Sequence, residues 1–402
     1  MIAKLRKLGP GCLFAGAAIG VSHLVQSTRA GADFGFGLLW ALLLINAVKY
    51  PFFEYGSRYA TATGKSLLHG YKKLGKGVLI AYFILTFATM FTIQTAVTIV
   101  TAGIASSLFG GSIVLWTAII TGICLSILVI GKYKVLDSLM KVIVICLTIS
   151  TLIAVILATG SVETVDFSQT FPTEAAAVGF LIAFMGWMPA PLDISVWHSV
   201  WTVEKIKLDP SIDAKQSRFD FNVGYVVTTL LAICFLALGA LVMFGSGESF
   251  SSAGGAFANQ LIALYTNGLG ENTKLIIGIA ALTTMFSTSL TTLDGSPRVM
   301  HLSSEILTGK TYTKGYIMWL LVLAFGTLLI FFFFLSEMGL LVKIATVLSF
   351  LTAPFYAIIN YALLNGKHTP ENARPSHRMR LFSLLGITVL FGFSAWYIST
   401  LF

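Results

Sequence analysis

Gly186-Trp187-Met188-Pro189-Ala190-Pro191 places a glycine and two prolines inside an apolar run. Glycine and proline within a membrane-spanning helix free backbone groups that hydrocarbon cannot satisfy. Such a break persists where the unwound backbone lines a cavity enclosed by protein. If the chain crosses a membrane, the stretch therefore predicts a helix that is broken near residues 188–191. A plain kink or close helix packing is the alternative interpretation.

The composition is that of a membrane protein. Of the 402 residues, 56% are hydrophobic and 11% are charged, whereas about a quarter of an ordinary soluble domain is charged. This excludes a soluble globular enzyme. It equally excludes a disordered or nucleic-acid-binding chain, because the net charge of +9 sits in a sequence too apolar to stay solvated when unfolded. The four cysteines lie in apolar runs, where we expect them to pack.

Apolar runs of about 20 residues, the length needed to cross a bilayer, predict eleven transmembrane helices. The loops between them are short, so we expect one compact all-α bundle in the lipid bilayer. The predicted spans are 11–31, 36–60, 78–108, 112–131, 137–159, 174–200, 221–245, 272–299, 315–335, 338–364 and 381–401.

Lysine and arginine gather in alternate loops. Most of the 26 fall in segments that lie on one side of the membrane if the N-terminus is cytoplasmic, and cytoplasmic loops carry an excess of these residues. We therefore predict a multi-pass protein of the cell (inner) membrane, with a cytoplasmic N-terminus and an extracytoplasmic C-terminus. The basic N-terminus and the apolar run after it are interpreted as a retained first span.

The predicted span 11–31 is also interrupted, because it contains Gly16 and Gly20-Val21-Ser22-His23 and begins at Gly9-Pro10-Gly11. It lies five spans before the span that contains Pro189. Since five is an odd number, the two spans cross the membrane in opposite directions, which indicates an inverted repeat. Paired broken helices in two inverted halves point to a transporter binding site near the bilayer midplane. The predicted units are 1–160 with a break near 20–23, 161–365 with a break near 188–191, and 366–402 with the eleventh helix.

Several motifs resemble the Nramp family of divalent-metal transporters. Gly9-Pro10 and Arg29 to Trp40 are similar to that family's first-helix and second-helix region, and Ser57 to Leu67 is similar to the segment that follows. Met188-Pro189 with His198-Ser199, and the run Ser287 to Thr292, are similar to its sixth and eighth helices. The resemblance implies the inverted-repeat fold of LeuT-type transporters, alternating access, a monomer, and a cation site between helices 1 and 6.

The chain departs from the family at the residues that bind metal. The family's first-helix Asp-Pro-Gly-Asn is here Gly20-Val21-Ser22-His23, and its sixth-helix Met-Pro-His is here Met188-Pro189-Ala190. Losing the Asp removes the charge that would compensate a dehydrated divalent ion, which disfavours a tight Mn²⁺ or Fe²⁺ site. The altered motifs, with Lys49 to Glu54, resemble a divergent branch of the family that is associated with hydrated Mg²⁺ transport.

Ionisable side chains within spans are candidates for function. His23 is a candidate metal ligand, or else a structural imidazole that closes the unwound turn. Asp193 is the only carboxylate close to either break, and it either faces the cavity or pairs with Lys343. Met188 is a third candidate metal ligand, or plain packing. The predicted substrate-binding residues are Gly20, Ser22, His23, Gln26, Trp187, Met188, Ala190 and Asp193.

Charged residues within or near the spans supply candidates for gating and ion pairing. Lys49 and Glu54 are about 140° apart around a helix, so they do not share a face and cannot pair with each other. Each must find another partner, or its side chain must extend to the membrane interface. The interface is closer for Glu54. Asp294 and Arg298 have i,i+4 spacing, which predicts either an intracellular gate or a plain surface pair. The candidate gating and ion-pair residues are Lys49, Asp294, Arg298 and Lys343.

The predicted function is transport of a small cation, with partly hydrated Mg²⁺ as the leading cargo. Predicted spans 78–108 and 315–335 contain no Asp, Glu or His, so we do not expect proton coupling. Motifs for hydrolytic or nucleotide chemistry are missing, so we expect neither an enzyme nor a cofactor. Two alternatives stay open: the same scaffold carrying an organic cation or small anion, and a receptor or assembly protein that transports nothing.

Overall fold

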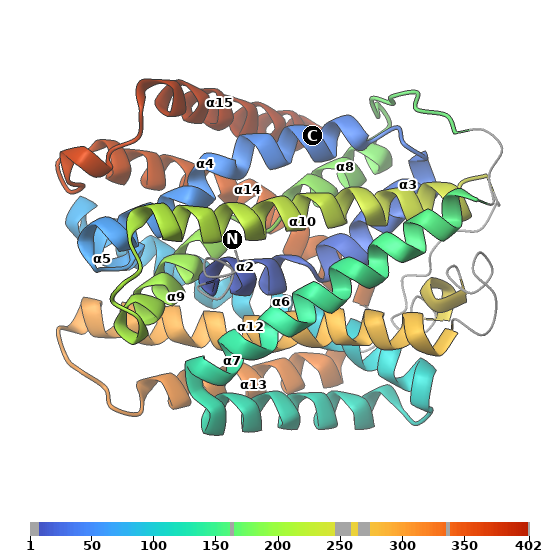
Figure 1. Cartoon of the computed structure of the whole chain (residues 1–402), viewed down its shortest axis with the longest axis horizontal. Helices are drawn as coiled ribbons and strands as arrows, with labels where there is room; N and C mark the ends of the chain where they lie inside the picture. Colours follow the sequence, from blue (N-terminus) through green and yellow to red (C-terminus); the bar gives the residue numbers. More distant parts are fainter. Residues whose placement is uncertain (1–7, 161–164, 246–258, 264–273, 335–337, 401–402) are drawn as a thin grey trace.

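The computed structural model describes residues 8–160, 165–245, 259–263, 274–334 and 338–400. Every regular element within these ranges is a helix, and the long helices lie together in one bundle (Figure 1). Seven helices of the described part are long and apolar enough to cross a membrane. The all-helical membrane fold predicted from the sequence is therefore confirmed.

The helices follow the order of the predicted spans. The first few residues of the predicted span 272–299, the last residues of the spans 315–335 and 381–401, and the segment 161–164 lie outside the described residues. The helices are α2 (Pro10–Ala18), η1 (Val21–Ser27), α3 (Thr28–Phe34), α4 (Leu39–Thr63), α5 (Leu67–Leu74), α6 (Lys76–Phe109), α7 (Ile113–Thr159), α8 (Ala175–Trp187), α9 (Ile194–Leu208), α10 (Ala214–Val242), α12 (Lys274–Thr308), α13 (Gly315–Phe334), α14 (Met338–Asn365), η4 (Glu371–Ala373) and α15 (His377–Ser399).

The outer surface of the bundle is apolar where helices face away from the core. Ile130 and Ile156 of α7 are 80% and 68% exposed, and Phe325 and Phe333 of α13 are 68% and 76% exposed. Exposed apolar surface on this scale marks a membrane or partner contact in a folded protein. On helices of this length and hydropathy, lipid is the environment that these side chains fit.

The predicted spans 112–131 and 137–159 fall on the two arms of one bent helix. Helix α7 runs without interruption from Ile113 to Thr159, and Figure 1 shows it as two straight segments that meet at a sharp bend. Both arms, Ile113–Ile130 and Tyr133–Thr159, count among the seven segments that are long and apolar enough to cross a membrane. Gly131 lies between the two arms and is followed by Lys132 and Lys134. A glycine weakens a helix without ending it, and the two lysines separate the two apolar runs.

Two helices of the bundle are interrupted. The first stops after α2, leaves Ile19 and Gly20 outside the helix, and resumes as the π-helix η1. The second stops after α8 and resumes as α9, which leaves residues 188–193 outside it. Both interruptions contain the glycine or proline residues that break helices.

The first interrupted helix packs against α10 with its backbone almost in contact. A Cβ atom at Gly11 would collide with the Asp220 carbonyl group, and a Cβ atom at Gly224 would collide with the carbonyl group of Gly11. Gly31 and Gly239 repeat this arrangement at the other end of the contact. Small residues allow such close approach between membrane helices, so α10 holds both halves of the broken helix.

Adding one methyl group at Gly224 is expected to destabilise the protein, because overpacking a filled contact costs about 1–3 kcal/mol. Thermal unfolding of purified Gly224→Ala in detergent should show a lower melting temperature than the wild type. Gly122→Ala is the matched control, since a Cβ atom there has nothing within 4 Å. A Gly224→Ala protein as stable as the wild type would contradict the close contact.

Candidate functional site

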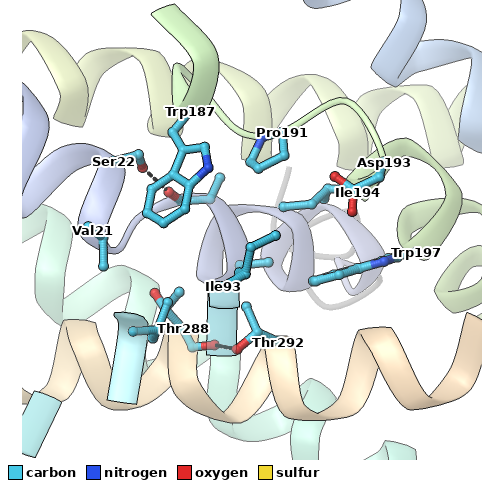
Figure 2. Close-up of a pocket in the computed structure, with 13 residues that line it drawn as sticks. Val21, Ser22, Ile93, Trp187, Pro191, Asp193, Ile194, Trp197, Thr288 and Thr292 are labelled. Carbon is cyan, nitrogen blue, oxygen red and sulfur yellow. Dashed lines mark hydrogen bonds between the residues drawn. The ribbon is translucent and has the colours of Figure 1, made fainter. Parts of the chain in front are cut away.

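A small cavity lies between the two interrupted helices. Its volume is about 30 Å³, which is room for roughly two water molecules. Figure 2 shows Trp187 and Pro191 on one side of it and the threonines of α12 on the opposite side. The lining residues are Ala17, Ala18, Val21, Ser22, Ile93, Val97, Trp187, Pro191, Asp193, Ile194, Trp197, Thr288 and Thr292.

Three of the predicted substrate-binding residues line this cavity, namely Ser22, Trp187 and Asp193. Asp193 carries the one carboxylate among the described lining residues. Trp187 donates a hydrogen bond from Nε1 to Ser349 Oγ at 3.0 Å, which orients its indole ring. With Trp197 the cavity has two indoles and one carboxylate, and both kinds of group attract a cation.

The lining residues on α6, α9 and α12 are not among the predicted substrate-binding residues. The spacing of the polar and aromatic ones contained a usable signal: Trp197 lies four residues after Asp193, and Thr292 lies four residues after Thr288. Residues four apart share one face of a helix, so each pair points to the same cavity. Ile93 of α6 offered no such signal, because it is one of many apolar residues in its span.

His23 does not line the cavity, and the structure gives it a structural role instead. The ring is fully buried. Its Nε2 donates to the carbonyl oxygen of Thr228 at 2.9 Å, and its Nδ1 lies 2.7 Å from Ser22 Oγ. Both ring nitrogens are thus occupied by protein atoms. Of the two predicted roles, the imidazole that ties the unwound turn to α10 matches the structure, and the metal ligand does not.

The other predicted substrate-binding residues also lie outside the cavity lining. A Cβ atom at Gly20 would collide with the side chain of Thr288 on α12, and Met188 Sδ accepts a hydrogen bond from Ser27 Oγ at 3.8 Å. The described residues contain no group of three or more His, Cys, Asp or Glu side chains that could hold a metal ion. Of the candidate metal ligands His23, Met188 and Asp193, Asp193 alone is among the lining residues, and Gln26 and Ala190 are likewise absent from the lining.

The first break is satisfied by hydroxyl groups of α12. Thr288 Oγ1 lies 3.0 Å from the carbonyl oxygen of Ile19 and 3.2 Å from that of Gly16. Ser287 Oγ lies 3.4 Å from the same Gly16 oxygen. Backbone carbonyls freed inside a membrane helix need such partners, so the Ser/Thr run of α12 stabilises the interruption.

The second break is satisfied by a lysine. Pro189 has no N–H group, so the Met185 carbonyl lacks its usual helical donor. Lys49 Nζ of α4 donates to the carbonyl oxygens of Met185 at 2.9 Å, Gly186 at 2.8 Å and Ala190 at 3.1 Å. The sequence predicted that Lys49 needs a partner other than Glu54. That partner is the backbone at the second break.

The contacts decide between the alternatives that the sequence left open for Asp193 and Glu54. Lys343 is exposed on α14, whereas Asp193 is buried and interacts electrostatically with Lys49. The alternative of an Asp193–Lys343 pair is therefore wrong. Glu54 has found another partner and does not reach for the interface: it is buried and forms ion pairs with Arg58 at 2.7 Å and Arg218 at 3.2 Å.

Asp294 is a buried junction between three helices. Its carboxylate pairs with Arg298 of α12 at 2.7 Å. It also accepts hydrogen bonds from Trp201 Nε1 of α9 at 2.9 Å and from the Tyr316 hydroxyl of α13 at 2.7 Å. The Arg298 guanidinium lies 4.9 Å from the centroid of the Tyr316 ring. Because Asp294 is fully buried, this is not a plain surface pair.

The sequence model of the family described as "Natural resistance-associated macrophage protein-like", Nramp, matches residues 11–400. The chain belongs to the Nramp family. A further relative is an uncharacterized protein of Pasteurella multocida (strain Pm70), which is 37% identical over 408 residues, with 99% of this chain and 93% of that protein covered. The predicted resemblance to the Nramp family is thereby confirmed.

Solved transporter structures share the fold of this Nramp-family chain. One is the Eremococcus coleocola manganese transporter in complex with an aromatic bis-isothiourea substituted compound. It has a TM-score of 0.75 at 14% identity, and the match covers 99% of this chain and 87% of the transporter chain. MhsT in complex with L-phenylalanine has a TM-score of 0.65 at 13% identity, with 96% and 98% covered. Mhp1, a nucleobase-cation-symport-1 family transporter, has a TM-score of 0.62 at 14% identity, with 98% and 93% covered. The LeuT-type fold predicted from the sequence is confirmed.

Removing the Asp294 carboxylate is expected to destabilise the protein by about 3–5 kcal/mol, because Arg298, whose side chain is only 18% exposed, would be left without its partner. The double variant Asp294→Ala, Arg298→Met should lose less, since it leaves no unpaired charge. Thermal unfolding in detergent measures both. Glu371→Ala is the control, because Glu371 is 88% exposed in its pair with Arg374 and such pairs contribute about 0–1 kcal/mol. Equal losses in the single and double variants would contradict the interpretation.

Proposed function

We propose that this Nramp-family protein transports a small cation across the membrane by alternating access, through the cavity between its broken helices. The observation that carries the proposal is Asp193, the single carboxylate among the described residues of the cavity lining. A buried charge within a membrane span is costly, and it typically marks a substrate or ion path. The proposed orientation is the one that the lysine and arginine pattern predicts, and the proposed unit is a monomer.

The leading cargo is Mg²⁺ that keeps part of its water shell. Beside Asp193 the described lining offers the hydroxyl groups of Ser22, Thr288 and Thr292 and neither imidazole nor thiol. Oxygen donors and retained water suit Mg²⁺, whereas transition metals favour nitrogen or sulfur ligands. The structurally similar Eremococcus coleocola protein is a manganese transporter, which supports a divalent metal as the class of cargo.

The cavity has to widen for this cargo. A volume of about 30 Å³ holds roughly two water molecules and no ion with a full hydration shell. We interpret the described conformation as a closed state of the transport cycle. Opening would separate the walls that Figure 2 shows facing each other, namely Trp187 and Pro191 on one side and Thr288 and Thr292 on the other.

Coupling to protons is not part of the proposal. The α6 wall of the cavity contributes Ile93 and Val97, and the nearest polar side chain of that helix is Gln94, whose Oε1 accepts a hydrogen bond from Thr292 at 2.5 Å. An amide does not titrate. Transport along the gradient of the cation itself is therefore the mode that we propose.

An organic cation is the second candidate cargo. Trp187 and Trp197 both line the cavity, and indole faces bind alkylammonium groups through cation–π attraction. Asp193 would then balance the charge of the ammonium group. This candidate depends on the aromatic rings, while the Mg²⁺ candidate depends on the hydroxyl groups.

Asp193→Asn is expected to reduce Mg²⁺ flux into liposomes by about tenfold or more, because a hydrogen bond to a charged group is worth about 1.5–3 kcal/mol. The assay uses purified protein, a Mg²⁺ gradient and a parallel Mn²⁺ arm, each with and without a pH gradient. Glu174→Gln is the matched control, since Glu174 is an exposed carboxylate just before α8.

The outcomes separate the candidates. Absence of divalent flux under every gradient would contradict the Mg²⁺ proposal, and full flux in Asp193→Asn would contradict the site. A melting temperature raised by alkylammonium salts and unchanged by Mg²⁺ would favour the organic cation, since a ligand stabilises the folded state that binds it. Flux that depends on the pH gradient would contradict transport without proton coupling.

A further inference from the structure

Lys49 Nζ sits at the point where three backbone carbonyls of the sixth span converge. Its side chain is 0% exposed, and its three hydrogen bonds are 2.8–3.1 Å long. A carbonyl oxygen can only accept, so the three bonds need three N–H donors. Only the ammonium form of lysine has three. The geometry therefore describes a cation enclosed by oxygen atoms.

The sequence around the break explains why positive charge belongs there. Helix α8 ends at Trp187, and the last carbonyls of a helix carry its partial negative charge. Pro189 removes one backbone donor that would have followed. Asp193 then adds a full negative charge just beyond the break, where it interacts electrostatically with Lys49. Without a cation, this part of the membrane interior would be strongly negative.

We propose that Lys49 is a tethered cation that permanently fills a cation site built by the carbonyls of Met185, Gly186 and Ala190. The site is distinct from the cavity that Asp193 lines, because none of these four residues belongs to the cavity lining. A free ion or small ammonium ion fits the same oxygen cage once the lysine amine is gone. The Lys49 ammonium, which is covalently attached to the chain, thus occupies a site that a free cation could otherwise bind and leave.

If the protein transports a cation as proposed above, Lys49 also affects which cation it accepts. The three carbonyls are not available to a transported ion while Lys49 occupies them. The ammonium that the three hydrogen bonds describe also places a positive charge at the second break, and it repels a divalent ion from the site. Lys49 therefore favours a cargo that keeps its water over one that sheds it for backbone oxygens.

Chemical rescue tests the tethered cation directly. Lys49→Ala removes three methylene groups and the amine, which n-propylammonium supplies in one molecule. The melting temperature of purified Lys49→Ala in detergent is expected to fall by roughly 4–6 °C, and millimolar n-propylammonium chloride should restore at least half of that loss. Tetramethylammonium chloride, which has no N–H donor, and 1-propanol, which has no charge, should restore none.

The controls use the wild type and Lys343→Ala, whose lysine also lies in a predicted span but is exposed. Neither should respond to n-propylammonium. Equal rescue by 1-propanol would show that only volume was lost, and would overturn the proposal. So would a Lys49→Ala protein that is as stable as the wild type without any amine.

Lys49→Gln covers the case in which Lys49→Ala cannot be recovered from membranes. Its amide keeps two donors and lacks the charge. Wild-type stability of Lys49→Gln would overturn the proposal, and a loss of stability that only Lys49→Arg avoids would support it. The melting experiments need no cargo, so they stand apart from the Mg²⁺ flux assay. In that assay, a several-fold higher apparent affinity for Mn²⁺ in Lys49→Gln supports the consequence for selectivity, and an unchanged affinity overturns it.

Discussion

Backbone carbonyls that lose their helical donors inside a membrane must find other donors within the protein, and this need decides how the helices pack here. Each interruption frees such groups, and lipid offers them no partner. The protein meets the need in two different ways. Hydroxyl groups of Ser287 and Thr288 approach the carbonyls of the first break, and the Lys49 ammonium binds those of the second. Both solutions bring other helices to the breaks, so the cavity between the breaks is enclosed by the same packing that satisfies the backbone.

The two halves of the first broken helix also need a fixed support. Glycines on both sides of the contact with α10 bring the two backbones together, and His23 adds a hydrogen bond from the break to Thr228 of that helix. The break is thus held in place from one side by α10 and from the other by α12. This arrangement lets an interrupted helix stay ordered while it contributes the Val21 and Ser22 wall of the cavity.

Much of the fold followed from the sequence because its rules are local. Apolar length and the Gly and Pro residues predicted membrane spans and the places where two of them stop. The sequence left alternatives open where partners are distant along the chain. The Thr228 carbonyl lies 205 residues from His23, and the carbonyls bound by Lys49 lie 136 to 141 residues from it. A single sequence contains no signal that pairs such residues, so it could not choose between a metal ligand and a structural imidazole for His23, or between the cavity and a pair with Lys343 for Asp193.

The Asp294 junction has a mechanical consequence. One carboxylate receives donors from Trp201 of α9, Arg298 of α12 and Tyr316 of α13. Sliding any one of these helices past the others would break a bond inside the protein, where the lost partner is not replaced by water. The three helices are therefore expected to travel as one rigid body. Helices α9 and α12 each supply a wall of the cavity, so these two walls would move together. The cavity could then open only if its other walls moved away from them.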